Sequence, residues 1–269
     1  MSVIVTDYAA LLPALGLLAR KAGAAILEVY RSDFEVRNKE DASPVTEADL
    51  KAEAIILAGL AALTPDIPVV SEEAAAAGAR FDVSQGRFWL VDPLDGTKEF
   101  VAKNGEFTVN IGLIDNGVPV VGALFAPVPD RLFLAAPGRA TVEDRGAPPR
   151  PISVRPRPEA GMVVLSSRSH RDSERFDTFI APLPVAELRH SGSSLKFALV
   201  AAGEADLYPR FGRTMEWDTA AGHAILRAAG GCMTLPDGSP LLYGKDGFLN
   251  PPVVAWGAPQ PCRILQDAE

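Results

Sequence analysis

The sequence predicts a layered α+β fold, in which two amphipathic helices precede a block of strands and a second half of alternating helices and strands. Two observations carry this prediction. Apolar residues recur at helical spacing near the N-terminus, and short apolar runs separated by turn residues follow. With 269 residues, the chain can form one large domain or two smaller ones that share an interface.

The first helix is expected over residues 7–31, where apolar side chains return every three or four positions. These are Leu11, Leu15, Leu18, Ala22, Ile26 and Val29. A second helix is expected over residues 46–63, ending before Pro65 because proline cannot continue a helix. The longest apolar run within a helical pattern, residues 54–63, is far shorter than the ~20 residues that a membrane-spanning helix needs.

A block of strands is expected next, at residues 69–70, 88–91, 107–114, 118–125 and 131–135. Residues 146–158 include five prolines and are the best candidate for a boundary. The second half is expected to hold strands at 162–165 and 205–208, helices at 172–180, 194–202 and 217–229, and a tail of short strands. We therefore expect an N-terminal α+β part, residues 1–150, and a C-terminal α/β part, residues 151–269.

The formal net charge is −8, from 34 acidic and 26 basic residues. This charge argues against binding to nucleic-acid polymers or anionic lipid, and taken alone it also argues against an anionic substrate. No basic residue precedes the first apolar stretch, unlike in a signal peptide, so a cytoplasmic protein without integral membrane association is expected. Cys232 and Cys262 are expected to be free thiols. No protein partner is predicted.

The most informative segment is FWLVDPLDGTKEF, residues 88–100. A strand leads Asp92 into a turn, and Asp95 follows three residues later, ahead of Gly96 and Thr97. Two carboxylates and a backbone carbonyl at one strand end suit Mg²⁺, which prefers oxygen ligands in near-octahedral geometry. An ordinary Asp-Gly turn has the same pattern, so this segment alone leaves both interpretations open.

Three further segments place acidic residues where helices or strands begin or end. Glu72 and Glu73 directly follow the first expected strand. Asp218 lies at the start of a helix, and Asp49 lies in the first turn of another. Each segment has a structural alternative. The two glutamates can be a solvated charge pair, Asp218 can be a helix N-cap, and Asp49 can belong to a capping box that begins at Thr46. A residue can both cap a helix and take part in catalysis.

Together these segments resemble the signatures of the magnesium-dependent, lithium-sensitive phosphatase superfamily that includes inositol monophosphatase and fructose-1,6-bisphosphatase. The matching stretches are Glu-Glu, then Trp-Leu-Val-Asp-Pro-Leu-Asp-Gly-Thr, then Trp-Asp-Thr-Ala-Ala-Gly. They occur in the expected order, and the resemblance covers about residues 11–251. It implies the αβαβα sandwich of that superfamily and metal-assisted hydrolysis of a phosphate monoester.

The resemblance also implies metal ligands. Glu72, Asp92 and the backbone carbonyl of Leu94 would hold one Mg²⁺. Asp92, Asp95 and Asp218 would hold a second, and a third, weaker ion beside Glu72 is left open. Such ions lower the pKa of a bound water and neutralise the leaving alkoxide.

Two further residues are implied to act in catalysis with Glu72. The Thr97 hydroxyl, linked to Asp49, would orient the attacking water. Glu73 would support the site from behind rather than bind metal.

Three features resemble the bisphosphate nucleotidase branch of the superfamily. The first is Lys98-Glu99 followed by residues 104–110. Inositol monophosphatases typically carry Thr-Asn in place of Lys98-Glu99. The second is residues 191–197, SGSSLKF, a turn that opens a helix and whose free N–H groups and Lys196 would bind an anion. The third is Arg210, where inositol monophosphatases place a sugar-binding glutamate, so a second phosphate is favoured.

The expected substrate contacts are Leu94, Asp95, Gly96, Thr97, Ser169, His170, Gly192, Ser193, Ser194, Lys196, Arg210 and Asp218. The implied substrate is a small bisphosphorylated nucleotide, 3′-phosphoadenosine 5′-phosphate, which would yield AMP and phosphate. An inositol or sugar phosphatase is the nearest alternative. A non-catalytic phosphonucleotide-binding regulator is the alternative of another class, and pairing of Arg210 with Glu204 or Asp206 is the alternative for that residue.

Overall fold

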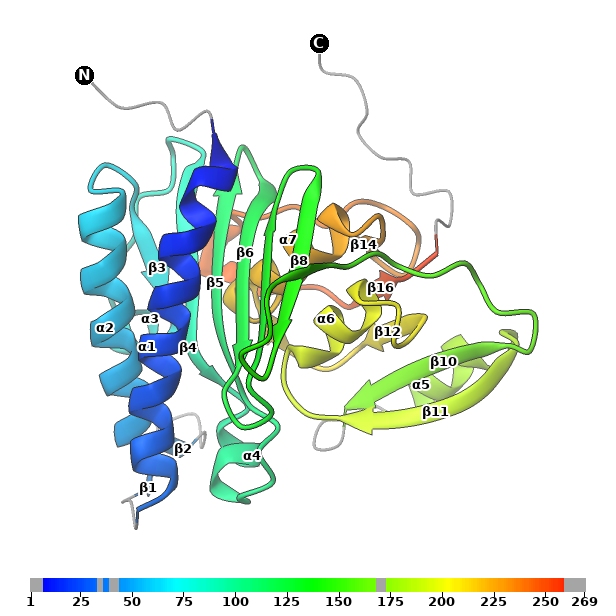
Figure 1. Cartoon of the computed structure of the whole chain (residues 1–269). Coiled ribbons are helices and arrows are strands. Elements are labelled where there is room, and N and C mark those ends of the chain that lie inside the picture. The colour runs from blue at the N-terminus through cyan, green and yellow to red at the C-terminus, as the bar shows by residue number, and fades with distance from the viewer. Residues whose placement is uncertain (1–6, 33–35, 39–43, 168–172, 259–269) are drawn as a thin grey trace.

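The computed structural model describes residues 7–32, 36–38, 44–167 and 173–258, and it has five layers (Figure 1). Two helices, a seven-stranded sheet, two further helices, a five-stranded sheet and one outer helix follow one another. The helices of these layers are α1 (Leu12–Tyr30), α2 (Glu47–Leu63), α6 (Leu195–Ala201), α7 (Glu216–Ala228) and α5 (Ser173–Ile180). The predicted αβαβα architecture is therefore confirmed.

The first sheet has the order β3-β4-β5-β6-β7-β8-β9, with β3 parallel to β4 and the remaining neighbours antiparallel. Its strands are β3 (Val69–Ser71), β4 (Arg87–Asp95), β5 (Thr108–Asp115), β6 (Val118–Ala126), β7 (Arg131–Ala136), β8 (Arg139–Asp144) and β9 (Arg150–Pro151). In β4, Trp89 and Val91 pack towards α1 and α2, whereas Phe88 and Leu90 pack towards α6 and α7. Because both faces are covered, β4 is apolar at every position of this run.

The helix α1 follows a short 3₁₀ helix, η1 (Tyr8–Leu11), and packs against α2 and the first sheet. By length and composition the segment Tyr8–Tyr30 could cross a membrane, which the expectation of no sufficiently long helix had missed. Leu15, Ala19 and Ile26 are fully buried inside the protein, however. A buried core helix passes the same test, so the finding is weak evidence for a membrane span.

The second sheet has the order β11-β10-β12-β16-β14. Its strands are β10 (Met162–Ser167), β11 (Val185–Ser191), β12 (Leu207–Arg210), β14 (Cys232–Thr234) and β16 (Val253–Trp256). One buried cluster joins Leu90 of the first sheet, Ile225 of α7 and Val253 of the second sheet. The helices α6 and α7 are thus shared by both sheets, and the division into residues 1–150 and 151–269 stays a prediction.

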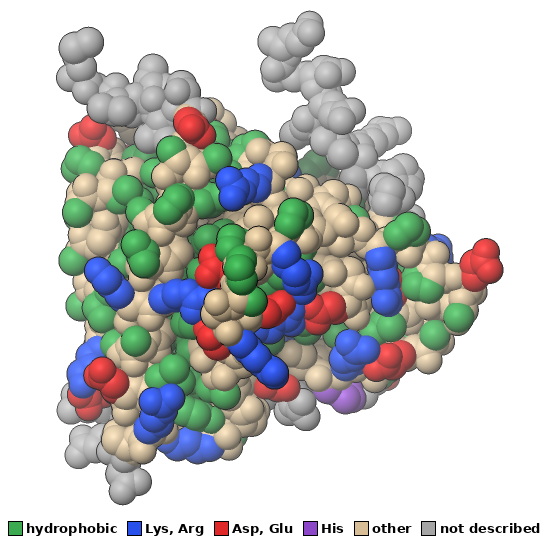
Figure 2. All heavy atoms as spheres, in the orientation of Figure 1, with side chains coloured by type: hydrophobic (Ala, Val, Ile, Leu, Met, Phe, Trp, Pro, Cys, Tyr) green, Lys and Arg blue, Asp and Glu red, His purple; other side chains and the backbone are tan. Residues whose placement is uncertain are grey.

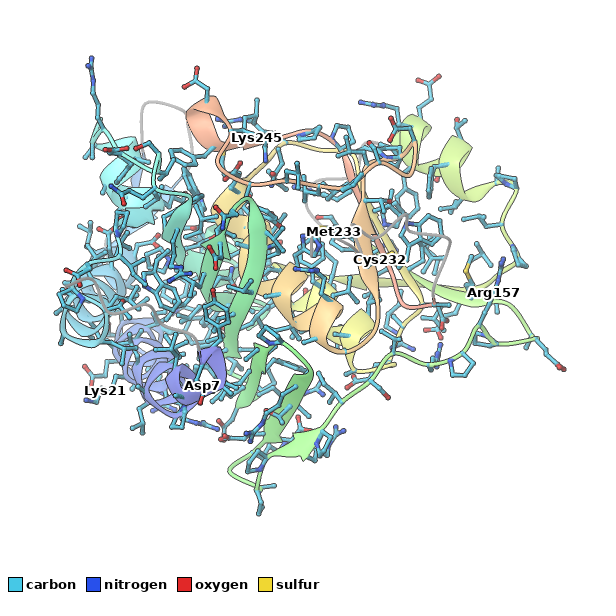
Figure 3. The ribbon with its side chains drawn as sticks, turned by 90° about the horizontal axis from the view of Figure 1, so that it is seen from above. Asp7, Lys21, Arg157, Cys232, Met233 and Lys245 are labelled. Atoms are coloured by element: carbon cyan, nitrogen blue, oxygen red, sulfur yellow. The ribbon has the colours of Figure 1, made fainter. Side chains whose placement is uncertain are left out.

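The remaining elements are short. They are β1 (Val36–Asn38) paired with β2 (Pro44–Thr46), β13 (Thr214–Met215) paired with β15 (Leu249–Asn250), α3 (Glu72–Ala76), α4 (Thr97–Val101) and η2 (Asp246–Phe248). An expectation about the cysteines was wrong, because Cys232 is disulfide-bonded rather than free. Figure 3 shows Cys232 and Met233 on β14, beside α7. The chain's other cysteine, Cys262, lies outside the described residues.

Acidic and basic side chains lie side by side over the middle of the face shown in Figure 2. The structure also contains ion pairs: Arg131 bonds Asp144 at 2.5 Å and Glu204 at 2.5 Å, and Arg20 bonds Asp130 at 2.7 Å.

Candidate metal and phosphate site

Three carboxylates from distant parts of the chain meet in one cavity. One oxygen of each of Glu72, Asp92 and Asp218 lies within 4.8 Å of the others. The cavity has a volume of about 220 Å³, and Leu94 and Asp95 also line it. Buried carboxylates repel one another unless a cation or protons neutralise them. This donor set fits a hard divalent cation, as the sequence predicts.

The first sheet places two of these acids. Because β3 and β4 are parallel and Ser71 pairs with Val91, the residues that follow this pair along the chain are Glu72, at the start of α3, and Asp92, within β4. The register between β4 and β5 then shifts between Asp92 and Asp95. The Leu94 N–H donates to Asp92 Oδ1 at 3.0 Å, which fixes that carboxylate in the turn. The motif is thus both an Asx-type turn and part of the acidic cluster.

The third acid comes from α7. Asp218 Oδ2 accepts a hydrogen bond from the Met215 N–H at 2.8 Å, in a capping arrangement at the start of the helix. The same side chain lines the cavity beside Glu72 and Asp92. The N-terminal end of α7 is positively polarised and favours a carboxylate there. The capping interpretation and the metal-ligand interpretation of Asp218 are therefore compatible.

Burial dominates the electrostatics of the cluster. It raises the pKa of Asp92 well above the ordinary value, and the charges of Glu72, Asp95, Asp218 and Asp49 raise that pKa further. The pKa of Asp218 is raised well above its ordinary value mainly by burial, then by Asp95 and Glu72. These raised pKa values reflect the unfavourable free energy of burying several negative charges close together. A bound cation would offset this free energy.

Asp95 is held by the loop that precedes α6. The Ser194 N–H donates to Asp95 Oδ2, and the Ser194 hydroxyl lies 2.8 Å from both Asn110 Oδ1 and Thr108 Oγ1. The Ser194 N–H is thus already bound to a carboxylate, and the anion-binding role of this loop stays a prediction. The loop connects the C-terminal half to the metal-site strand.

Lys196 lies beneath this loop rather than out in solvent. It is 2% exposed, and its Nζ donates to the carbonyls of Ser191 at 3.0 Å and Ser193 at 2.5 Å. Burial lowers the pKa of Lys196 to about 8, although the nearby Asp95 charge opposes this shift. Lys196 lines the cavity, and in turn its charge lowers the pKa of Asp95 against the effect of burial.

Two arginines border the same cavity. Arg210 ends β12, and its Nη2 donates to the Arg213 carbonyl at 3.3 Å. Among the described residues, the ion pairs of Glu204 and Asp206 are formed with other arginines: Glu204 bonds Arg131, and Asp206 bonds Arg155 at 2.6 Å. The positive charge of Arg210 lies close enough to lower the pKa of Asp218. A phosphate bound beside the acids would therefore meet a guanidinium.

Two glycines allow the loops around Asp95 to pack closely. Gly96 has φ of 96°, and a Cβ there would lie 3.0 Å from the Glu106 carbonyl oxygen. A Cβ on Gly192 would lie 2.8 Å from Glu106 Cβ, Glu106 O and Glu99 Cγ. Both positions therefore need glycine to bring Ser193 and Ser194 next to the Asp95 turn.

The remaining predicted residues have different outcomes. The Thr97 hydroxyl donates to the Leu94 carbonyl at 3.4 Å, and Asp49 is 2% exposed in the first turn of α2. Their direct link stays a prediction. Glu73 is buried in α3. Ser169 and His170 lie outside the described residues.

Sequence reasoning assigned no role in the site to several residues, among them Thr108, Asn110, Tyr208 and Arg213. Thr108 and Asn110 hold Ser194, whereas Tyr208 and Arg213 line the cavity. One signal was available for the first two. They alternate on one face of an otherwise apolar strand, where a buried polar side chain requires a hydrogen-bond partner.

Comparison with known proteins agrees with this geometry. The inositol monophosphatase family model matches residues 7–264. The 3′(2′),5′-bisphosphate nucleotidase CysQ of Escherichia coli (strain K12) is 50% identical over 240 residues, which cover 87% of this chain and 94% of that protein. The crystal structure of CysQ from Bacteroides thetaiotaomicron has a TM-score of 0.81 and 38% identity, covering 94% of this chain and 99% of the other.

A second solved structure, inositol monophosphatase from Anabaena (Nostoc) sp. PCC 7120, has a TM-score of 0.75 and 30% identity, covering 94% of this chain and 92% of the other. The chain belongs to the inositol monophosphatase family. The predicted family, fold and phosphatase class are confirmed.

Proposed function

We propose that this protein hydrolyses the 3′-phosphate of 3′-phosphoadenosine 5′-phosphate, giving AMP and phosphate. The observation that carries the proposal is the position of Arg210, which borders the cavity of Glu72, Asp92 and Asp218. A guanidinium there suits a substrate with a second phosphate. The identity to CysQ nucleotidases supports the same substrate class.

Mg²⁺ is the proposed metal, because the donor set consists of carboxylates together with the Leu94 carbonyl. Two ions would be held by Glu72, Asp92, Asp95 and Asp218. A third ion would bind beside Glu72. When bound, Mg²⁺ activates water and neutralises the leaving oxygen of a phosphate ester. Lithium inhibition is proposed on the same basis, as competition for one metal position.

The chain's own residues have separate proposed tasks. Thr97 and Asp49 orient the attacking water with Glu72, and Arg210 binds the phosphate that is not cleaved. Lys196, through the Ser191 and Ser193 carbonyls, keeps the loop closed over Asp95. Gly96, Gly192, Ser193 and Ser194 form the wall beside the substrate, and Ser169 and His170 are proposed contacts in the neighbouring loop.

Phosphate release measures the proposal directly. We expect turnover of 3′-phosphoadenosine 5′-phosphate with Mg²⁺, loss of turnover with a chelator, and inhibition by Li⁺. The corresponding 5′-phosphosulfate is expected to be a second substrate, which would place the protein in recycling of by-products from sulfate activation and sulfonation. A higher kcat/KM for inositol 1-phosphate would overturn the nucleotidase proposal in favour of the inositol phosphatase alternative.

The Asp95→Asn variant separates catalysis from mere binding. We expect kcat to fall at least about 100-fold, because Asp95 is both a proposed ligand and the partner of Ser194. Asp237→Asn, in an exposed turn, is the matched control and should retain full turnover. Unchanged turnover in Asp95→Asn would contradict the assignment of Asp95 as a metal ligand. If the wild-type protein binds the nucleotide but does not hydrolyse it, the protein is a regulator rather than an enzyme.

The proposed location is the cytoplasm. Peripheral association with the cytoplasmic face of the inner membrane is the alternative location. The proposed organisation keeps metal-site motifs in residues 1–150 and substrate-site motifs in residues 151–269. Asp218 is the exception, because it lies in the second part and completes the acidic cluster.

A further inference from the structure

A second cavity lies along the C-terminal half of α7, away from the acidic cluster at the N-terminal end of the same helix. Its volume is about 390 Å³, within the range of small-molecule sites. Most of its lining is apolar, from β6, β14 and the segment Pro240–Leu242, and it includes Met233, Leu241 and Val120. Neither the proposed reaction nor the metal site uses any of these residues.

Two polar side chains of α7 border this cavity, one helical turn apart. His223 and Arg227 are four residues apart, so they lie on the same face of the helix, about 6 Å apart along its axis. Arg227 Nη1 donates to the Pro119 carbonyl at 2.8 Å, and among the described residues no carboxylate forms an ion pair with this guanidinium. A positive charge at the edge of an apolar cavity favours an anionic group of a ligand.

His223 presents a neutral ring to the cavity. Burial lowers its pKa to about 3, so the imidazole is uncharged at neutral pH. Its Nδ1 lies 3.0 Å from the Tyr243 hydroxyl, which itself donates to Thr219 Oγ1 at 3.2 Å. Nδ1 is therefore the protonated nitrogen, and Nε2 is left as an acceptor for a ligand donor.

The same hydrogen bonds continue to the metal site. From Thr219, the Asn250 side chain bonds Thr219 Oγ1 at 3.0 Å and the Met215 carbonyl at 2.7 Å. The Met215 N–H in turn donates to Asp218. The side chains of Thr219, Asn250, Tyr243 and His223 are all buried. Hydrogen bonds, together with the backbone of Met215, thus connect His223 at the second cavity to Asp218, a proposed metal ligand.

We propose that this cavity binds a small molecule with an apolar body, a hydrogen-bond donor for His223 and an anionic group for Arg227, and that its occupancy changes Mg²⁺ affinity at Asp218. Indole-3-acetate is a suitable probe, because its ring N–H and carboxylate are separated by a flat apolar body. The binding part of the inference does not depend on which phosphate ester the enzyme cleaves.

Calorimetric titration of the full-length protein with indole-3-acetate tests the site. We expect saturable binding in the wild type, at least about tenfold weaker binding in Arg227→Gln, and none in Ala228→Phe, whose ring would fill the cavity. Arg157→Gln is the matched control, since Arg157 is exposed and lies far from Cys232 and Met233 in Figure 3. Absence of saturable binding at millimolar probe, or equal affinity in Arg227→Gln, overturns the site.

One competing occupant is testable in the same experiment. Cys232 lines the cavity and is disulfide-bonded, and the segment after Cys262 contains Ile264, Leu265 and Asp267. If the probe binds only in Cys262→Ser or under reducing conditions, the cavity belongs to the chain's own C-terminal segment, and the small-molecule proposal is wrong.

Mg²⁺ titrations with and without saturating probe test the coupling, with binding heat rather than activity as the readout. We expect a change of about fivefold or more in Mg²⁺ affinity, and by reciprocity the same factor in probe affinity when Mg²⁺ is saturating. Tyr243→Phe removes the hydroxyl that joins His223 to Thr219 and should keep probe binding while abolishing the coupling. An identical Mg²⁺ affinity with and without probe in the wild type overturns the coupling.

Discussion

Arg210 is the residue on which the choice of substrate depends. It lies at the end of β12 and lines the same cavity as the acidic cluster and Arg213. Replacing it with glutamate would put a fourth acid beside Asp218 and remove the only charge assigned to the second phosphate. We expect Arg210→Glu to lower kcat/KM for 3′-phosphoadenosine 5′-phosphate by about 100-fold and for inositol 1-phosphate by much less.

The comparison between the two substrates is the internal control for this variant. General damage to the metal site would reduce both rates equally, and Arg157→Glu reports any effect of changing the net charge alone. An equal loss for both substrates in Arg210→Glu would show that the guanidinium does not read the second phosphate.

His223 gives a pH prediction for a titratable group outside the metal site. Its folded-state pKa is about 3 because of burial, whereas the unfolded chain has a value near 6.5. Below pH 6.5 the unfolded state binds a proton that the folded state does not, so stability is present above 6.5 and is lost as pH falls towards 3. We expect this group to remove about 1 kcal/mol of unfolding free energy per pH unit below pH 6.

Denaturant unfolding at pH 7, 6 and 5 measures this slope. His223→Gln keeps a polar partner for Tyr243 but cannot titrate, so its stability should depend less steeply on pH than that of the wild type. Parallel slopes for the two proteins would mean that other groups cause the dependence.

At the residue scale, the acids of the cluster were predictable because their chemistry appears as short motifs at strand and helix ends. Glu72, Asp92 and Asp218 meet as expected. The buried role of Lys196 was not predictable, because sequence spacing places it in the first turn of α6 but does not reveal the carbonyls of Ser191 and Ser193 above it. Those contacts depend on the tertiary path of the loop.

At the scale of elements, the loop from Ser191 to Ser194 links the two halves of the site. Because a Cβ on Gly192 would meet Glu106 and Glu99 at 2.8 Å, Gly192→Ala must displace this loop and weaken the Ser194 N–H bond to Asp95. We expect Mg²⁺ affinity, measured by calorimetry, to fall about tenfold.

A glycine in a helix gives the matched control for this substitution. Gly16→Ala, within α1, meets only the flexible ends of Leu134 and Leu132, at 3.2 Å and 3.3 Å. It should leave Mg²⁺ affinity unchanged and improve helix propensity. Normal Mg²⁺ binding by a folded Gly192→Ala protein would mean that the loop does not position Asp95.

The elements themselves were predicted unevenly, for physical reasons. The helices α1 and α2 and the strands β4 to β7 carry strong apolar patterns, since each is covered by other layers. The strand β11 was missed because five of its seven residues are exposed at a sheet edge, where apolar alternation is not required. The strands β8 and β9 follow tight turns. They were not predicted, and β9 falls within the boundary expected at residues 146–158. The helices α3 and α4 are single turns formed by the acidic motifs themselves.

At the scale of the whole molecule, the net charge of −8 and the acidic cluster set the order in which metal and substrate bind. Without a cation, the cavity holds Glu72, Asp92, Asp95 and Asp218, and an anionic nucleotide would be repelled despite Arg210. Mg²⁺ reverses the local sign, because a divalent ion is the largest charge in such a site. We therefore expect no measurable binding of 3′-phosphoadenosine 5′-phosphate to chelator-treated protein, and binding to appear only as Mg²⁺ is added.

Metal removal should also change stability, because burial and mutual repulsion raise the pKa values of Asp92 and Asp218 in the metal-free state. Saturating Mg²⁺ at 100 times its dissociation constant contributes about 2.7 kcal/mol to unfolding free energy. Thermal unfolding with chelator, Mg²⁺ and Mg²⁺ plus nucleotide should give three increasing midpoints. A nucleotide that raises the midpoint in chelator would contradict this order, since it would show that Arg210 and Arg213 attract the substrate without a bound cation.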